Sequence, residues 1–272
     1  MFKKSVLGQI STQTNYPQVI QTAINNNEIE MENTTKLLIN HIFCHALIIP
    51  AFFYGELWMF IASFVWWYII AIVAISGGYH RYYSHRAFKT KKWYPYAVNI
   101  LGIFSGAGPA MTWAATHKQH HAYSDTLDDP HSYTKHGWFA VYFNTWGYNA
   151  RIKRRFIKSL LRDKTLIWFY ENYFKLNIGI IIVFTFIDPL FMIFGYALPV
   201  VLAFHGYGIL NILGHYKGKP NNTVIGNILT AGEGWHLNHH QQPGNYNIGR
   251  KWYEFDPTKW FIRLIRTDKK FA

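Results

Sequence analysis

Residues 57–86 read LWMFIASFVWWYIIAIVAISGGYHRYYSHR, an uncharged apolar run followed directly by a histidine-rich segment. The apolar part, residues 57–78, is 22 residues long. About 20 apolar residues are enough for a helix to cross the hydrocarbon core of a bilayer. The stretch therefore predicts a transmembrane helix with histidines at its end.

Three further apolar runs have the same character. They cover residues 37–54, 170–187 and 190–213, and Asp188-Pro189 separates the last two. Together with 57–78 they predict an all-α integral membrane fold of four transmembrane helices in two hairpins. Residues 1–36 are polar and are interpreted as an N-terminal tail, and residues 37–272 as one membrane domain.

The basic residues indicate how this layout is oriented. All 27 lysines and arginines fall in the tail, in residues 79–175 or in residues 215–272. With four spans, these three segments lie on one side of the membrane, and an excess of basic residues marks the cytoplasmic side. We therefore expect both termini and a helical cap, formed by the long loops, in the cytoplasm.

One more uncharged run, residues 93–116, is long enough to span. Lys89, Lys91 and Lys92 precede it and Lys118 follows it, so basic residues flank both of its ends. Charge therefore does not favour a crossing. We expect this segment to lie in the membrane interface or to dip in and return.

Composition excludes several classes of protein. Half of the 272 residues are hydrophobic and 15% are charged, against about 25% charged in an average soluble domain, which argues against a disordered chain. The single cysteine, Cys44, excludes an intramolecular disulfide framework. The net charge is +13, and the lysines and arginines that produce it lie in the segments that flank the predicted spans. Such placement indicates contact with anionic membrane lipid and not nucleic-acid binding.

The histidines form three clusters and one weaker element. These are the pair His80 and His85, the HKQHH motif with His117, His120 and His121, the HLNHH motif with His236, His239 and His240, and the aligned pair Asn211 and His215. Positions i, i+3 and i+4 share one face of a helix. The step of five from His80 to His85 does not, so one of that pair is expected where the helix ends or kinks.

These clusters predict metal binding. Neutral imidazole is a good ligand for zinc, copper and iron, and inward-facing imidazoles in an apolar core are costly unless they bind something. One zinc takes four ligands, so nine histidines suggest two ions. All the clusters must then meet on one side of the membrane, which requires that residues 93–116 do not cross.

Other metalloprotein classes fit less well. A ferritin-like carboxylate site needs two Glu-x-x-His motifs, and the chain has one, Glu233 to His236. No HExxH motif of a zinc protease is present. A histidine-rich metal transporter stays open as an alternative, although transporters place their ligands near the bilayer midplane and these clusters lie at the ends of spans.

At these motifs the chain resembles the membrane-bound fatty acid desaturase family, and within it most of all the delta-9 acyl-CoA and acyl-lipid desaturases. The matching segments are HRYYSHR (80–86), HKQHHAYSDTLDDPH (117–131), NILGH (211–215) and GEGWHLNHH (232–240). The resemblance implies an O2-dependent enzyme that inserts a cis double bond, at the delta-9 position, into a saturated acyl chain. It leaves the acyl carrier open. A hydroxylase or ketolase on the same scaffold stays as an alternative.

The resemblance also implies the composition of the site. It implies two iron ions on the nine clustered histidines, with Asn211 contributing through a water. Asp125 and Asp129 match the family's acidic pair and would orient ligands by accepting imidazole N–H groups. Glu233 is not expected to bind metal, because His236 of its Glu-x-x-His motif already belongs to a cluster; we expect it to contact a ligand or to act as a substrate gate. The electrons would come from a separate donor, ferredoxin or cytochrome b5, because no His-Pro-Gly-Gly haem motif is visible. Lys118 stands where the family usually has arginine, which puts a headgroup contact in doubt.

Overall fold

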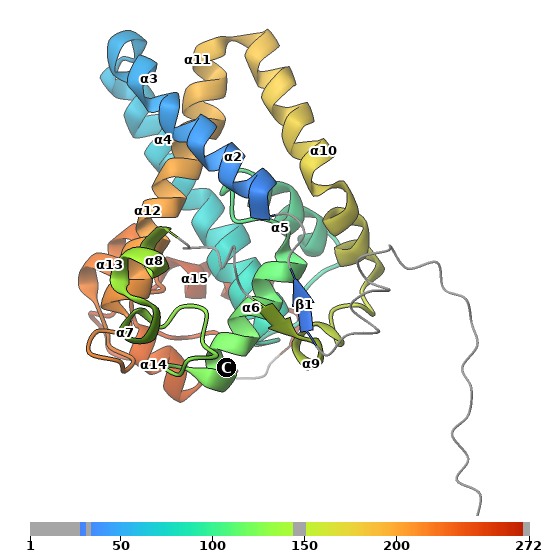
Figure 1. The fold of residues 1–272 in the computed structure, drawn as a ribbon, viewed down its shortest axis with the longest axis vertical. Coiled ribbons are helices and arrows are strands. Elements are labelled where there is room, and N and C mark those ends of the chain that lie inside the picture. Colours follow the sequence, from blue (N-terminus) through green and yellow to red (C-terminus); the bar gives the residue numbers. More distant parts are fainter. Residues whose placement is uncertain (1–27, 31–33, 144–150, 269–272) are drawn as a thin grey trace, which may run out of the picture.

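The computed structural model describes residues 28–30, 34–143 and 151–268, and the described chain is mostly helical (Figure 1). Four helical segments are long and apolar enough to cross a membrane: Thr35–Tyr54, Leu57–Ser84, Lys164–Ile187 and Pro189–Leu213. The prediction of four membrane-length helices is thereby confirmed. The predicted N-terminal tail falls almost entirely outside the described residues.

Most of these segments are built from shorter helical pieces. The first joins α2 (Thr34–Ala46) and α3 (Ile48–Tyr54), and the second joins α4 (Leu57–Ile70) and η1 (Ala71–Ser84). The third is the single helix α10 (Lys164–Ile187), and the fourth joins α11 (Pro189–Met192), η2 (Ile193–Ala197) and α12 (Leu198–Leu213). The turns between α3 and α4 and between α10 and α11 both lie at the top of Figure 1.

Two of the segments are longer than the sequence predicted. The second continues from residue 78 to Ser84, and the third begins at Lys164 instead of residue 170. Asp163 explains the second difference, because its carboxylate accepts the Thr165 and Leu166 amides and caps the helix. An apolar pattern cannot show a polar first turn of this kind.

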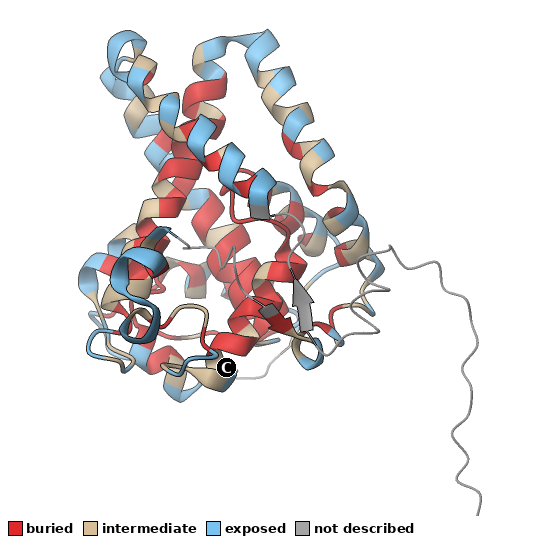
Figure 2. Ribbon diagram, viewed as in Figure 1, coloured by how far each residue is buried: buried red, intermediate tan, exposed pale blue. Residues whose placement is uncertain are grey.

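Exposed apolar side chains mark the upper part of the molecule. Phe52, Phe53, Leu57, Trp58 and Phe186 are all exposed there, and exposed residues cover the upper helices in Figure 2. A surface of this kind is typical of contact with lipid. The buried residues gather around η1 and α6 and along η2 and α12.

The uncharged run at 93–116 forms two short helices. These are α5 (Tyr94–Ile103) and α6 (Ala110–Tyr123), and the turn between them contains Gly106 and Gly108 with φ of +64° and +81°. Glycine is favoured at such angles because it has no Cβ. With 10 and 14 residues, neither helix is long enough to cross a membrane alone.

Smaller elements complete the lower part. They are α7 (Tyr133–His136), α8 (Trp138–Phe143), α9 (Arg154–Ile157), α13 (Val224–Leu229), α14 (His236–Gln241) and α15 (Pro257–Ile265). The all-α expectation missed one feature, a two-stranded antiparallel sheet of β1 (Glu28–Glu30) and β2 (Arg151–Lys153), with Ile29 opposite Ile152. Three-residue strands are too short to give a readable alternating pattern.

Candidate metal centre

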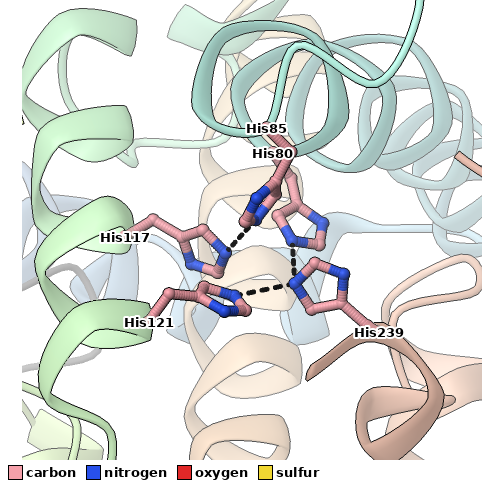
Figure 3. A group of neighbouring side chains, drawn as sticks. All are labelled: His80, His85, His117, His121 and His239. Atoms are coloured by element: carbon pink, nitrogen blue, oxygen red, sulfur yellow. Dashed lines mark hydrogen bonds between the residues drawn. The ribbon is translucent and has the colours of Figure 1, made fainter. Parts of the chain in front are cut away.

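Nine histidines from four regions of the chain converge below the membrane-length helices. Their ring nitrogens form two groups, within each of which the potential ligand atoms lie no more than 4.8 Å apart. The five-histidine group contains His80, His85, His117, His121 and His239 (Figure 3). The four-histidine group contains His120, His215, His236 and His240. These are the nine residues that the sequence analysis singled out.

The end of the second membrane-length helix positions His80 and His85. η1 is a π-helix, and the His85 amide donates to the His80 carbonyl over 3.1 Å, a step of five residues. The ring centroids of His80 and His85 are 4.9 Å apart. The expectation that one of this pair sits at a helix end is confirmed, because His85 is the C-cap residue.

The two HxxHH motifs each contribute to both groups. On α6, His117 and His121 belong to the five-histidine group, and His120 belongs to the other. On α14 the division is reversed, since His236 and His240 join the four-histidine group and His239 the five-histidine group. Residues at i and i+4 are about 40° apart around a helix, and i+3 lies on the other side of i. The spacing itself thus allows one helix turn to serve two ions.

Hydrogen bonding alone does not account for the four-histidine group. The four Nε2 atoms form a row of three contacts. His236 Nε2 lies 2.8 Å from His215 Nε2 and 3.1 Å from His240 Nε2. His240 Nε2 in turn lies 3.3 Å from His120 Nε2. The Nδ1 atoms of His120 and His215 face carboxylates, so their Nε2 atoms carry lone pairs. If His236 and His240 donate to them, both of their Nε2 atoms carry hydrogen, and the contact between His236 and His240 has no acceptor. Four Nε2 lone pairs around one cation satisfy every contact.

The five-histidine group has a similar arrangement. His239 Nε2 lies 3.0 Å from His80 Nε2 and 2.8 Å from His121 Nε2, and His117 Nε2 lies 2.9 Å from His85 Nε2. A single N–H of His239 cannot serve both of its neighbours well. Imidazole nitrogens suit iron as well as zinc and copper, so the residues present fit the pair of irons that the resemblance implied.

Burial favours the neutral form, which binds metals, in seven of the clustered imidazoles. Desolvation lowers the pKa well below its usual value in His85, His117, His120, His121, His236 and His239, and the neighbouring imidazoles lower it further. The same causes lower the pKa of His240 to about 3. At neutral pH these side chains are therefore available as ligands.

Three carboxylates contact the outer nitrogens of the histidines. Asp129 Oδ1 lies 2.8 Å from His120 Nδ1, and Asp125 Oδ2 lies 3.0 Å from His215 Nδ1. Glu233 Oε2 contacts His80 Nδ1. Such contacts fix the imidazole tautomer and turn Nε2 toward a metal. All three residues therefore lie where they can orient ligands, and Glu233 lies behind His80 instead of among the ligand atoms.

Arg81 and Asp256 are the functional candidates that the sequence analysis missed. Arg81 is buried and donates to Glu233 Oε1 over 3.0 Å and to Asp256 Oδ2 over 2.9 Å. Burial would raise the pKa of Glu233, but His80 and Arg81 hold it at about 2. The sequence did contain a signal for this pair. Arg81 directly follows His80 at the end of an apolar span, and a charged residue in such a place needs a partner of opposite charge.

Two predicted residues lie outside the groups. Asn211 is on α12, one turn before His215, and is half-buried; its role through a water stays a prediction. Lys118 lies on α6 between the ligand candidates, with its Nζ 3.3 Å from Ser159 Oγ. Burial and the nearby Arg86 lower the pKa of Lys118 to about 8.

The remaining membrane histidines form ordinary interhelical hydrogen bonds. His45 Nε2 lies 3.2 Å from His205 Nε2, and Tyr142 Oη lies 2.7 Å from His205 Nδ1. The Nδ1 atom of His45 contacts the His41 carbonyl. One choice of tautomers satisfies this whole chain, which distinguishes it from the two clustered groups.

Comparison with known proteins agrees with this geometry. The family model described as fatty acid desaturase matches residues 56–266, which include every clustered histidine. The chain belongs to the fatty acid desaturase family. Membership makes it an oxidoreductase of acyl chains, and the metal-transporter alternative is set aside.

The curated relatives include acyl-lipid and acyl-CoA desaturases. An sn-2 palmitoyl-lipid 9-desaturase of Nostoc sp. (strain 36) is 29% identical over 238 residues, covering 82% of each protein. Delta-9 acyl-lipid desaturase 1 of Arabidopsis thaliana is 26% identical, covering 73% of this chain and 69% of the relative. Acyl-CoA desaturase 1 of Saccharomyces cerevisiae is 31% identical, covering 74% of this chain and 43% of the yeast protein.

Proposed function

We propose that the protein is an O2-dependent acyl desaturase that places a cis double bond at the delta-9 position of a saturated fatty acyl chain. The main observation in support of this proposal is that nine histidines converge into two groups of potential metal ligands. Family membership supports the reaction class, and the names of several relatives support the delta-9 position and an acyl-CoA or acyl-lipid substrate.

The metal centre in this proposal consists of two iron ions, one in each histidine group, with Asn211 contributing through a water. Two irons so held would supply the oxidising power to remove two hydrogens from adjacent methylenes, with O2 as acceptor and two electrons from a separate ferredoxin or cytochrome b5. The protein's own contribution is positional. Asp125, Asp129 and Glu233 fix the imidazole tautomers, and the buried surroundings keep the imidazoles neutral.

The membrane arrangement is part of the same proposal. The four membrane-length helices form two hairpins, the turns 54–57 and 187–189 face away from the cytoplasm, and the histidine groups lie in a cytoplasmic cap with both termini. The position of the basic residues supports this orientation. It also brings the metal centre to the membrane surface, where an acyl chain anchored in lipid can reach it.

The test is expression in a host that lacks its own desaturase, followed by gas chromatography of fatty acid methyl esters. We expect a new monounsaturated peak, whose double bond is located by mass spectrometry. His120→Ala should abolish the peak, because it removes a ligand from the four-histidine group. His205→Ala is the matched control and should keep the peak, because His205 belongs to neither histidine group and its ring contacts His45 and Tyr142.

Product chemistry separates the proposal from its nearest alternative. A hydroxy or keto fatty acid in place of the monounsaturated ester would identify a hydroxylase or ketolase on the same scaffold. An unchanged fatty acid profile, with iron and reductant supplied, would contradict the proposed reaction.

A further inference from the structure

We propose that the two histidine groups are electrostatically unequal, and that the four-histidine group binds the first metal ion more tightly than the five-histidine group binds the second. This inference rests on the proposed function in one respect, that both groups bind metal. It goes beyond it by assigning an order of loading and naming the residues that set it.

The four-histidine group is backed by two carboxylates. Asp129 is fully buried and contacts His120 Nδ1, and Asp125 contacts His215 Nδ1. The carboxylate of Asp129 also accepts two neutral backbone amides, those of Asp125 at 2.8 Å and His131 at 2.9 Å. Over residues 28–30, 34–143 and 151–268, neither aspartate forms an ion pair with lysine or arginine. Two negative charges therefore act on this group.

The five-histidine group is backed by one carboxylate whose charge is offset. Glu233 contacts His80, and the Arg81 guanidinium lies 3.0 Å from its other oxygen. Arg81 also pairs with Asp256 at 2.9 Å. Glu233, Asp256 and Arg81 together carry one net negative charge, against two behind the four-histidine group.

This difference in charge should change the affinity of each group for a divalent cation. A carboxylate behind an imidazole raises the basicity of the ligand, and charges in a buried site interact more strongly than in water. The four-histidine group has fewer ligands but two full negative charges behind them. The five-histidine group has more ligands but only one net negative charge behind them. We expect the affinities of the two groups to differ by at least about tenfold.

The experiment measures metal binding without turnover. The full chain in detergent is stripped of metal and titrated anaerobically with ferrous iron alone against a competing chelator. We expect two binding steps that differ at least about tenfold in dissociation constant. The two steps are assigned with ligand variants: His236→Ala should remove the tight step, and His121→Ala should remove the weak step and leave the tight one.

Asp129→Asn tests the cause of the difference. This change keeps the shape of the side chain but removes its charge. We expect the dissociation constant of the tight step to rise about 10- to 100-fold, the usual effect of replacing a residue that hydrogen-bonds to a metal ligand. Glu233→Gln should act on the weak step only. Asp128→Asn is the matched control, because Asp128 is in the same loop but half-exposed and paired with Lys153 at 2.7 Å. It should leave both steps unchanged.

The outcomes separate this inference from the proposed function. Two steps of equal affinity in the unmodified protein overturn the inference and leave the proposed two-metal centre standing. The same holds if His236→Ala retains the tight step, or if Asp129→Asn and Asp128→Asn bind alike. Failure of the unmodified protein to bind two ions overturns both. A second readout, the Mössbauer spectrum after one equivalent of ⁵⁷Fe, should show one predominant iron environment in the unmodified protein and a larger share of the second environment in Asp129→Asn.

Discussion

Arg81 connects three regions of the molecule through its side chain. Its Nη1 donates to Asp256 and to the Tyr246 carbonyl at 2.7 Å, and its Nη2 donates to Glu233. Asp256 in turn caps α15 by accepting the Lys259 amide. A buried charge is tolerated when it is paired and hydrogen-bonded. This one joins η1 to the segments before α14 and α15.

Replacing Arg81 by methionine should destabilise the protein strongly. The substitution leaves Glu233 and Asp256 buried without their cation, which typically costs about 3–5 kcal/mol. The loss is measurable as a lower thermal midpoint of the purified protein in detergent. Lys153→Met removes a partner of Asp128 on a surface where both side chains meet solvent, and it should change the midpoint little. Equal losses in the two variants would show that the buried ion pairs stabilise no more than surface ones.

At the level of elements, η1 depends on close packing against α5. Gly78 has no side chain to accommodate, and a Cβ added there would lie 2.4 Å from Val98 Cγ1. Small residues let helices approach closely in membranes. Since η1 carries His80, this contact helps to set the depth of the first ligand.

Gly78→Ala should therefore destabilise the protein by about 1–3 kcal/mol, as overpacking of a core does. Val98→Ala in the same chain should recover part of the loss, because it removes the methyl groups that the new Cβ meets. Thermal unfolding of the single and double variants tests both statements. Gly179→Ala on α10 is the control, since a Cβ there meets nothing within 4 Å. If Gly78→Ala were as stable as the unmodified protein, close packing at Gly78 would be contradicted.

At the level of the whole molecule, the two ends of the helices should face different compartments. Glu56 lies in the turn between α3 and α4, and Lys219 lies after α12, near the histidine groups; both are exposed. Because basic residues collect on the histidine side, that side should be cytoplasmic.

Cysteine labelling tests this orientation. In a Cys44→Ser background, Glu56→Cys should react with a membrane-impermeant maleimide in intact cells, whereas Lys219→Cys should react only after permeabilisation. The Cys44→Ser protein itself has no cysteine and gives the blank. The reverse pattern would place the metal centre outside the cytoplasm, and labelling of both sites in intact cells would contradict a membrane between them.

The sequence by itself determined the four membrane-length helices and the nine histidines, because apolar length and ligand spacing are local properties. Only the tertiary structure decided which histidines share a group. His117 and His120 are three residues apart but belong to different groups, and the choice depends on how η1, α6 and α14 bring their histidines together. The same holds for Arg81, whose partners are 152 and 175 positions away. Pairings over such distances arise from packing, which no local pattern records.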